Sequence, residues 1–468
     1  MAPLSELDSL QRTLNQAIDS LRDELNRQSL PELTSKAHRH PMDDYAFLCS
    51  PRLYEARRLT LAAIGEIKNL VQFPFEKVVE QACAVYDTAC LDILVKTGLV
   101  DKLAEPSVLN DGMDVHDLQE ALDMDAIKLT VVLRDLSSQG WLRERREGTF
   151  ALARPALELI GTSAGRMWAL NTGRPLVAQA LMDQLTHPEW KYSHRANHSA
   201  FQLSHKTDLA IFDWMKLHPD RASQLSKTIQ AVGDAYRVAT VNDFPWKKLE
   251  GRTFVDCAGG QGNLSIILSE ILPQSQFIVQ DLPEVIATAR ENIARTAPAA
   301  AQSARIIAEV ANIFDVQPRR GEGFVYLLRL TLHNWSDEAC ISILKNIASV
   351  MSPTSKLILL EVVAQPNTLL LGPGPAPGVS CEPAVTLDTL IGEETYRPIT
   401  SPEYIPTNFG AAARTSLTLD IQMMALFNAQ ERTQREWTVL ANSAGLHVVD
   451  VHAFRGTVSA LECELSRP

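Results

Sequence analysis

The sequence lacks several features that would each assign the protein to a particular class. It contains no run of about 18 apolar residues, the length that a membrane-spanning helix requires. The first residues do not show the basic and then apolar pattern of a secretory signal peptide. Lysine and arginine number 44 against 56 acidic residues, which gives a net charge of −12. Because binding to phosphate groups needs a basic surface, we expect neither a nucleic-acid partner nor a membrane partner.

Cysteine is also sparse, and its pattern excludes the usual cysteine sites. The 7 cysteines are scattered and odd in number, and none pairs at the spacing of metal ligands. Free thiols in a reducing compartment are the simplest interpretation, so we expect a cytoplasmic protein without a bound metal. The 468 residues, 46% of them apolar, are enough for two or three domains with a sizeable core.

A glycine-rich loop follows a short apolar run in the second half of the chain. The run ends at Asp256 and leads into Gly259, Gly260 and Gly262, after which the apolar residues have helical spacing. Strand, glycine loop and helix in this order bring the backbone of a doubly wound α/β domain close to a nucleotide-like ligand. A second apolar run ends at Asp281, whose carboxylate is then placed to bind the two hydroxyls of a ribose.

A histidine lies at the end of a third apolar run. This predicted strand delivers Thr331, His333 and Asn334 at its C-terminal end, where open α/β sheets bind ligands. The next strand ends in Glu361, and Glu431 follows further along. Histidine titrates near neutrality and a carboxylate can fix its tautomer, so the group suits proton removal from a hydroxyl. From the residues alone, a general base and a structural histidine are both open interpretations.

The first part of the chain is predicted to be mainly helical. Regularly spaced leucines indicate an amphipathic helix within an N-terminal arm, residues 1–50. Residues 51–155 combine helices with two short strands around a charged turn, the pattern of a winged helix. The helix at 75–94 is apolar on most sides, so we expect it to be buried. Few basic residues lie on the presumed recognition helix, which favours a dimerisation domain over DNA binding.

The remaining chain divides into a helical region and an α/β domain. Residues 156–245 are predicted to form a helical linker and substrate-pocket region, with core packing as the alternative role for its aromatic residues. Residues 246–468 form the α/β domain, which contains an insertion at 366–415 rich in proline, glycine and threonine. Within this insertion we expect residues 372–379 to be flexible and the rest to cover the pocket as a lid.

Taken together and in their order along the chain, these motifs resemble those of the plant and fungal small-molecule O-methyltransferases that use S-adenosylmethionine. The resemblance covers about residues 75–465. The family's glycine motif is matched by residues 255–262, its Asp-Leu-Pro loop by 281–283, and its Leu-His-Asp-Trp stretch by 332–335. The resemblance implies a class I methyltransferase domain, α/β and Rossmann-like, after an N-terminal, mainly helical winged-helix domain that forms a homodimer.

The resemblance also implies a role for each candidate residue. His333 would remove a proton from a phenolic or enolic hydroxyl of a small-molecule secondary metabolite, supported by Glu361 and Glu431. The implied contacts to the cofactor S-adenosylmethionine come from Asp256, Gly259, Gly260, Gly262, Asp281, Leu282, Asn312, Ile313, Phe314 and Arg329. The expected substrate contacts are Phe201, His205, Trp214, Thr331, Asn334, Met423 and Met424.

Three residues depart from the family's pattern. Ala258 replaces the first glycine, Asn312 stands where an aspartate near the adenine amine is usual, and Asn334 replaces the aspartate after the histidine. None of these changes removes the chemistry of methyl transfer.

These departures from the family's pattern nevertheless leave a second function open. Some proteins resembling this family are pericyclases of polyketide or pyridone alkaloid pathways, which catalyse dehydration, Diels–Alder, hetero-Diels–Alder or Alder-ene steps. Such a step needs a shaped apolar pocket and a hydrogen-bond donor or charge on a carbonyl, and no nucleophile. Bound S-adenosylmethionine would then keep its methyl group, or the reaction would not use it at all. A non-catalytic binding role is the third alternative.

Overall fold

The computed structural model describes residues 5–170, 174–369 and 384–466, and its centre is a mostly parallel sheet. The main path of this eight-stranded sheet runs β10–β11–β8–β7–β4–β5–β6, and β9 pairs with β8. Parallel pairing joins β4, β5, β6, β7 and β8, whereas β11 is antiparallel to β8 and β10. The strands are β4 (Thr253–Cys257), β5 (Gln276–Asp281), β6 (Ile306–Val310), β7 (Val325–Arg329), β8 (Lys356–Ala364), β9 (Arg432–Thr433), β10 (Leu446–Ala453) and β11 (Val458–Leu465).

Helices cover both faces of this sheet. Continuous apolar sequence in β4, β7 and β8 buries side chains on both sides, as parallel strands require. One face packs against α13 (Arg237–Asn242), α14 (Asn263–Ile271), α15 (Pro283–Thr296) and α16 (Pro298–Gln302). The opposite face packs against α17 (Asp337–Ala348) and α19 (Gln434–Ser443). The expected doubly wound α/β fold is confirmed.

The strand order determines where a ligand can bind. From β4 the chain moves outward to β5 and β6, then returns to the other side of β4 to form β7 and β8. The loops after β4 and β7 therefore leave the same edge of the sheet in opposite directions. This reversal point is the usual binding crevice of an open α/β sheet.

A winged-helix unit with its own core lies in the N-terminal half. The short strands β1 (Met113–Asp114), β2 (Leu142–Arg146) and β3 (Thr149–Leu152) pair antiparallel in the order β1–β3–β2. Their core includes residues of α3 (Pro74–Lys96), α4 (Leu99–Leu103), α5 (Val115–Leu122) and α6 (Ala126–Ser138).

The prediction that the helix at 75–94 is buried is wrong for the single chain. Only Leu94 and Val95 of α3 are buried, because the helix lies at the margin of the winged-helix core and uses only its C-terminal end there. Large apolar side chains on the rest of α3 are exposed, with Phe75 at 78% and Tyr86 at 68%.

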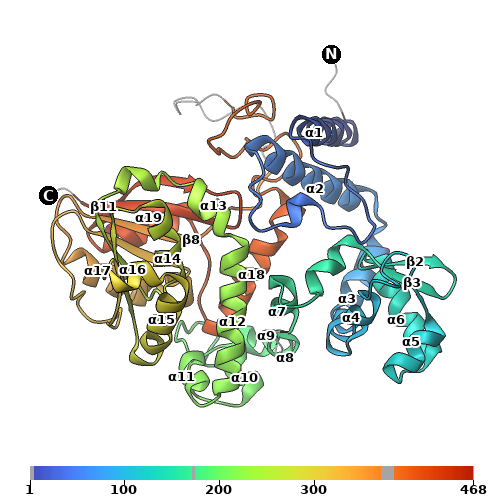
Figure 1. Ribbon diagram of the computed structural model, residues 1–468, viewed down its shortest axis with the longest axis horizontal. Coiled ribbons are helices and arrows are strands. Elements are labelled where there is room, and N and C mark those ends of the chain that lie inside the picture. The colour runs from blue at the N-terminus through green and yellow to red at the C-terminus, as the bar shows by residue number, and fades with distance from the viewer. Residues whose placement is uncertain (1–4, 171–173, 370–383, 467–468) are drawn as a thin grey trace.

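Short helices connect the winged helix to the α/β domain. They are η2 (Arg154–Leu159), α7 (Ala164–Leu170), α8 (Arg174–Gln179), α9 (Leu181–Thr186), α10 (Ala200–His205) and α11 (Ile211–Lys216). The longer α12 (Pro219–Ala235) follows them. In Figure 1, α12 runs through the middle of the molecule beside α18 (Arg414–Phe427), between the sheet and the winged helix. The 3-10 turn η3 (Trp246–Leu249) then leads into β4.

The N-terminal arm and the insertion form a further packing unit. The helices α1 (Glu6–Arg27) and α2 (Pro51–Val71), joined through η1 (Pro41–Asp43), share an apolar core with Leu387, Leu390, Ile399, Ile405 and Phe409 of the insertion. The insertion ends in η5 (Gly410–Ala413), where the Cβ of a residue replacing Gly65 would lie 2.4 Å from the Cβ of Ala411.

The expected lid is therefore wrong for residues 384–413 of the insertion, whereas Thr415, near the end of the insertion, lines the main cavity. Residues 384–413 contribute nothing to the wall of the main cavity and pack instead on α1 and α2. Buried polar contacts hold them there, because Arg52 donates to the carbonyl of Leu387 at 3.0 Å and Tyr396 donates to Glu55 at 2.6 Å. Residues 372–379, expected to be flexible, lie outside the described residues. None of the helices in the described parts of the chain is long and apolar enough to cross a membrane.

Candidate active site

A short turn after β7 carries His333 into the binding crevice. The strand ends at Arg329, and Leu330 follows with φ +48°, a left-handed conformation that is strained for a residue with a side chain. The 3-10 turn η4 (Leu332–Asn334) then begins, with Thr331 as its N-terminal cap residue. This reversal of the backbone directs the chain away from the sheet at its carboxyl edge, so that His333 lines the main cavity.

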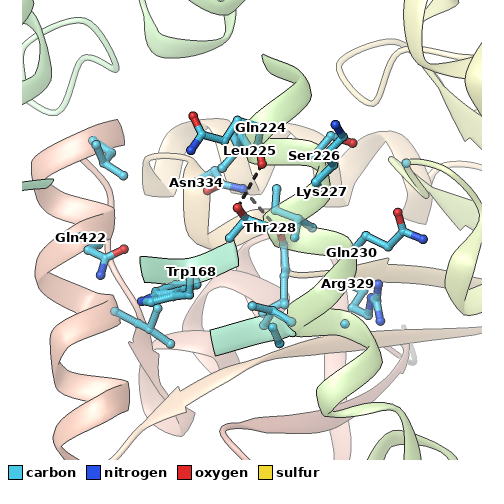
Figure 2. Close-up of a pocket in the computed structure, with 18 of the residues that line it drawn as sticks. Trp168, Gln224, Leu225, Ser226, Lys227, Thr228, Gln230, Arg329, Asn334 and Gln422 are labelled. Atoms are coloured by element: carbon cyan, nitrogen blue, oxygen red, sulfur yellow. Dashed lines mark hydrogen bonds between the residues drawn. The ribbon is translucent and has the colours of Figure 1, made fainter. Parts of the chain in front are cut away.

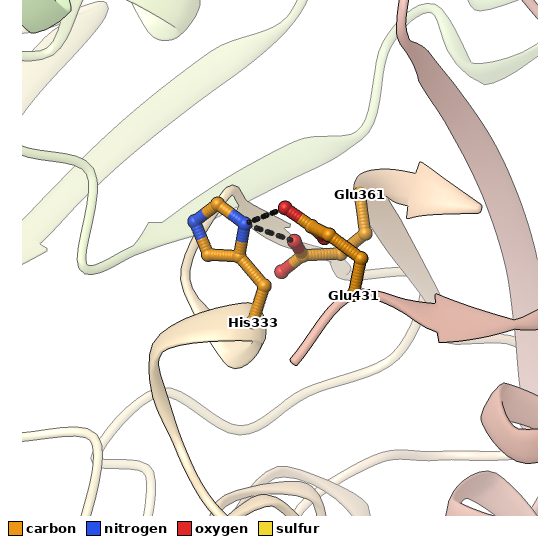
Figure 3. Close-up of side chains that lie close together, drawn as sticks. All are labelled: His333, Glu361 and Glu431. Atoms are coloured by element: carbon orange, nitrogen blue, oxygen red, sulfur yellow. Dashed lines mark hydrogen bonds and ion pairs between the residues drawn. The ribbon is translucent and has the colours of Figure 1, made fainter. Parts of the chain in front are cut away.

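Two glutamates face the histidine from neighbouring strands. His333 Nδ1 lies 2.9 Å from Glu431 Oε1 and 4.0 Å from Glu361 Oε2. Glu361 Oε1 accepts the backbone N–H groups of Thr331 at 3.0 Å and Leu332 at 2.8 Å. Figure 3 shows both carboxylates on the same side of the imidazole, with the other ring nitrogen on the far side. Glu361 thus holds the turn, and Glu431 holds the ring.

Burial and the charges of neighbouring side chains shift the pKa values of His333 and Glu361. Burial opposes a charge on His333, but the carboxylates of Glu361 and Glu431 outweigh it and raise the pKa of the histidine. Burial, together with the nearby Glu431 carboxylate, raises the pKa of Glu361 to about 7. Because Nδ1 is the nitrogen that donates to Glu431, the neutral ring has its lone pair on Nε2. His333 can therefore accept a proton from a group in the cavity.

The same three residues could also hold a metal ion. Their possible ligand atoms lie within 4.8 Å of one another, and the second oxygens of both glutamates are buried without a hydrogen-bond partner. The short Nδ1–Glu431 contact already has the geometry of a histidine oriented by a carboxylate. A hydrogen bond from Nδ1 of His333 to the Glu431 carboxylate accounts for that contact without a metal.

The glycine loop after β4 builds the other half of the crevice. The backbone N–H of Gly260 donates to Asp281 Oδ2 at 2.9 Å, and that of Leu282 donates to Asp281 Oδ1 at 2.7 Å. These bonds hold the Asp281 carboxylate at the edge of the cavity, where its remaining lone pairs can accept hydroxyl groups. A Cβ on Gly260 would meet no atom within 4 Å, so it would project into the space beside the loop.

Ala258 occupies a position that favours glycine. Its φ of +53° lies in the left-handed region, so the methyl group carries conformational strain of about 1 kcal/mol. The sequence alone could not give this angle. Next to it, buried Asp256 accepts a hydrogen bond from the Ser265 hydroxyl at 2.7 Å and lies near the buried cation of Arg329.

An aromatic wall continues the cavity away from the glycine loop. Trp335, beside the turn that carries His333, contacts Phe314 with ring centroids 4.8 Å apart and Phe212 at 5.9 Å. Phe201 stacks on His205 at 4.2 Å, and Trp214 meets both rings edge to face. Such faces suit a flat, mostly apolar ligand.

Most of the residues predicted from the sequence are brought together in one cavity of about 2870 Å³, large enough for two ligands of ordinary size. Three predicted contacts do not line it. Gly262 packs toward Ile293 and Val279 instead, and Glu361 acts from behind the turn. Met424 is missing from the wall although Met423 is in it, because successive residues of α18 face different sides. Residues that do line it are His333, Glu431, Asp256, Gly259, Gly260, Asp281, Leu282, Asn312, Ile313, Phe314, Arg329, Phe201, His205, Trp214, Thr331, Asn334 and Met423.

The sequence gave no indication of the α12 wall. Figure 2 shows Gln224, Ser226 and Gln230 of this helix beside the cavity, with Trp168 and Arg329 on either side. Gln261 of the glycine loop donates to the Ser226 hydroxyl at 2.9 Å, so α12 contacts the loop directly. No motif marks these positions, because only the packing of distant segments places α12 there.

Comparison with known proteins agrees with this architecture. Residues 191–369 match the family described as the O-methyltransferase domain. The O-methyltransferase gedA of Aspergillus terreus (strain NIH 2624 / FGSC A1156) is 28% identical over 451 residues, covering 89% of this chain and 87% of that protein. The expected resemblance to O-methyltransferases is therefore confirmed.

Solved structures share the fold at lower identity. One described as a pericyclic reaction enzyme aligns with a TM-score of 0.67 at 19% identity, over 97% of this chain and 100% of that one. LepI in complex with S-adenosylmethionine aligns with a TM-score of 0.65 at 22% identity, over 88% of this chain and 94% of that one. At such identity the likeness concerns the fold alone.

Proposed function

We propose that this chain, of which residues 191–369 match the O-methyltransferase domain family, methylates a phenolic or enolic hydroxyl of a small secondary metabolite. The observation that carries the proposal is the hydrogen bond between His333 Nδ1 and buried Glu431, in the cavity that also contains Asp281 and the glycine loop. A histidine oriented by a carboxylate is suited to remove a proton from a weakly acidic hydroxyl.

The residues present fit S-adenosylmethionine as the cofactor. The Asp281 carboxylate suits a ribose, and the open face of Gly260 allows close approach of a ligand to the backbone. Ile313 and Phe314 offer apolar contact to the adenine, and the Asn312 side chain offers an amide. When bound, this cofactor supplies an electrophilic methyl group on its sulfonium.

The residues of the chain then provide proton removal and orientation. The aromatic wall holds a flat acceptor with its hydroxyl toward Nε2 of His333, which takes the proton. Glu431 stabilises the resulting imidazolium, and Glu361 keeps the turn in place. Most of the rate gain comes from holding the acceptor oxygen in line and excluding water.

One assay tests this function. The protein is incubated with labelled S-adenosylmethionine and a panel of phenolic and enolic acceptors, and S-adenosylhomocysteine is measured. We expect a methylated product that is lost in His333→Ala and retained in His116→Ala, since His116 is exposed and lies outside the cavity. Because the pKa of His333 is raised, the rate should fall as the pH drops below that raised value.

The second candidate function is a pericyclase, since the same fold includes a pericyclic reaction enzyme. The intact His333–Glu431 pair favours methyl transfer, because a pericyclic step needs no base. Isomerisation or loss of water without S-adenosylhomocysteine, surviving in His333→Ala, would contradict methyl transfer and support the alternative.

We further propose that two copies associate through α3. The exposed apolar side chains of this helix, among them Phe75, Val78 and Tyr86, support such an interface. Light scattering should give a mass of about twice 51.7 kDa, and Phe75→Glu should give the monomer mass. A wild-type monomer at micromolar concentration would contradict this.

A further inference from the structure

The turn that carries His333 is held from two sides. On one side, the N–H groups of Thr331 and Leu332 donate to Glu361. On the other, the guanidinium of Arg432 donates from Nη1 to the carbonyl of Leu332 at 3.2 Å and from Nη2 to the carbonyl of Trp335 at 2.7 Å. The two carbonyls lie directly before and shortly after His333. The backbone around the base is thus fixed at both its donors and its acceptors.

The Arg432 side chain is buried, and its hydrogen bonds hold the turn and the residues next to it. It is 1% exposed, and its Nε donates to Asp337 Oδ1 at 2.9 Å, at the start of α17. Its charged carbon lies 5.2 Å from the ring centroid of buried Trp437. A buried cation is costly unless it is paired and hydrogen-bonded. Here every nitrogen has an acceptor, so the planar guanidinium joins the carbonyls of Leu332 and Trp335 to the Asp337 carboxylate of α17.

Strand pairing explains why this arginine can reach the turn. Residue 432 pairs in parallel register with Val363 of β8, two residues beyond Glu361. The preceding residue, Glu431, binds the imidazole. The short β9 strand therefore brings one side chain to the histidine ring and the next to the backbone that carries it. Any shift of the turn relative to β9 changes both contacts together.

We propose that Arg432 is a positioning residue for proton removal. It holds the turn so that Nδ1 of His333 stays on Glu431 and Nε2 faces the cavity. This inference rests on the proposed function for its consequence in catalysis, whereas the geometry it predicts at His333 can be measured without turnover.

The test compares Arg432→Lys with Arg435→Lys, because Arg435 lies three residues on and is exposed. Lysine keeps the charge but lacks the planar fork, so it cannot bind both carbonyls and Asp337 together. A misplacement of about 1 Å can cost about 100-fold in rate. We expect kcat to fall by about 10- to 100-fold in Arg432→Lys, with a smaller change in the KM of the acceptor.

The pH dependence separates positioning from loss of folded protein. As the turn loosens, His333 loses part of its contact with the carboxylate that raises its pKa, so the acidic limb of the rate profile should move to lower pH. A loss of folded protein would lower the rate by the same factor at every pH and would not move the acidic limb of the profile. Arg435→Lys should match the wild type in both measurements.

A second measurement does not depend on activity. In protein labelled with ¹⁵N-histidine, the ring signals of His333, identified by their absence in His333→Ala, report its tautomer and its pKa. Arg432→Lys should lower that pKa and weaken the Nδ1–H tautomer. Unchanged ring signals, or an unshifted pH profile, would overturn the positioning role. If the wild type makes no S-adenosylhomocysteine but Arg432→Lys still shifts the ring signals of His333, the proposed function is refuted and the positioning role of Arg432 stands.

Discussion

The buried carboxyl of Glu361 should make the stability of the protein depend on pH in a defined window. Its pKa is raised from 4.5 to about 7 by burial and by the neighbouring Glu431. Between these values the carboxyl is protonated in the folded chain and ionised in the unfolded chain. The folded state therefore binds more protons, and the free energy of unfolding falls as the pH rises through this interval.

The size of this effect follows from the two pKa values. The interval from 4.5 to about 7, at about 1.4 kcal/mol per pKa unit, amounts to about 3 kcal/mol. Glu361→Gln removes the titration but keeps an oxygen that can accept the N–H groups of Thr331 and Leu332. We expect this variant to match the wild type near pH 4.5 and to exceed its free energy of unfolding by about 3 kcal/mol at pH 8.

Urea denaturation at several pH values between 4.5 and 8 measures this difference. Comparing the two proteins cancels the titration of groups that do not interact with residue 361. Glu250→Gln is the matched control, because Glu250 is exposed and the variant makes the same change of residue type outside the group of His333, Glu361 and Glu431. A constant difference between Glu361→Gln and the wild type across the range would show that folding does not raise the pKa of Glu361, and the electrostatic reasoning would fail.

Three further changes test other parts of the structure. Ala258→Gly should keep or raise the free energy of unfolding, by up to about 1 kcal/mol, because it relieves a left-handed φ of +53°. Ala287→Gly, at an exposed position of helix α15, should lower it by about 1 kcal/mol. Gly65→Val should cost about 1–3 kcal/mol, since its Cβ would lie 2.4 Å from that of Ala411; an unchanged urea midpoint would refute the close packing. Asp281→Asn should weaken binding of S-adenosylhomocysteine by about 10-fold in calorimetry, and unchanged affinity would remove Asp281 from the cofactor site.

The fold could be predicted because several sequence motifs along the chain indicated the same arrangement of strands and loops. The glycine loop, Asp281 and His333 each follow an apolar run, and parallel strands bring their carboxyl ends to one edge. Motif order therefore brought most of the predicted site residues to the cavity. The burial of α3 could not be predicted in the same way, because apolar content does not tell whether the covering surface belongs to the same chain.

Other features depend on backbone angles and distant contacts. The left-handed angles of Ala258 and Leu330 leave no mark in the sequence. The position of Met423 in the wall and Met424 outside it depends on the rotation of α18, which the sequence does not determine. Arg432 directly follows Glu431 in the sequence, but its role becomes apparent only from the carbonyls that it binds.

The shared apolar core of the N-terminal arm and the insertion limits how these two segments can change, both in evolution and in engineered proteins. The two segments are separated by most of the chain, yet each covers the apolar surface of the other. The insertion also connects β8, just after Glu361, to α18. Loss of either segment alone would leave the other with an uncovered apolar face. The two should therefore be gained, lost and exchanged together, so a chimera between relatives should swap residues 6–71 and 384–413 as a single unit.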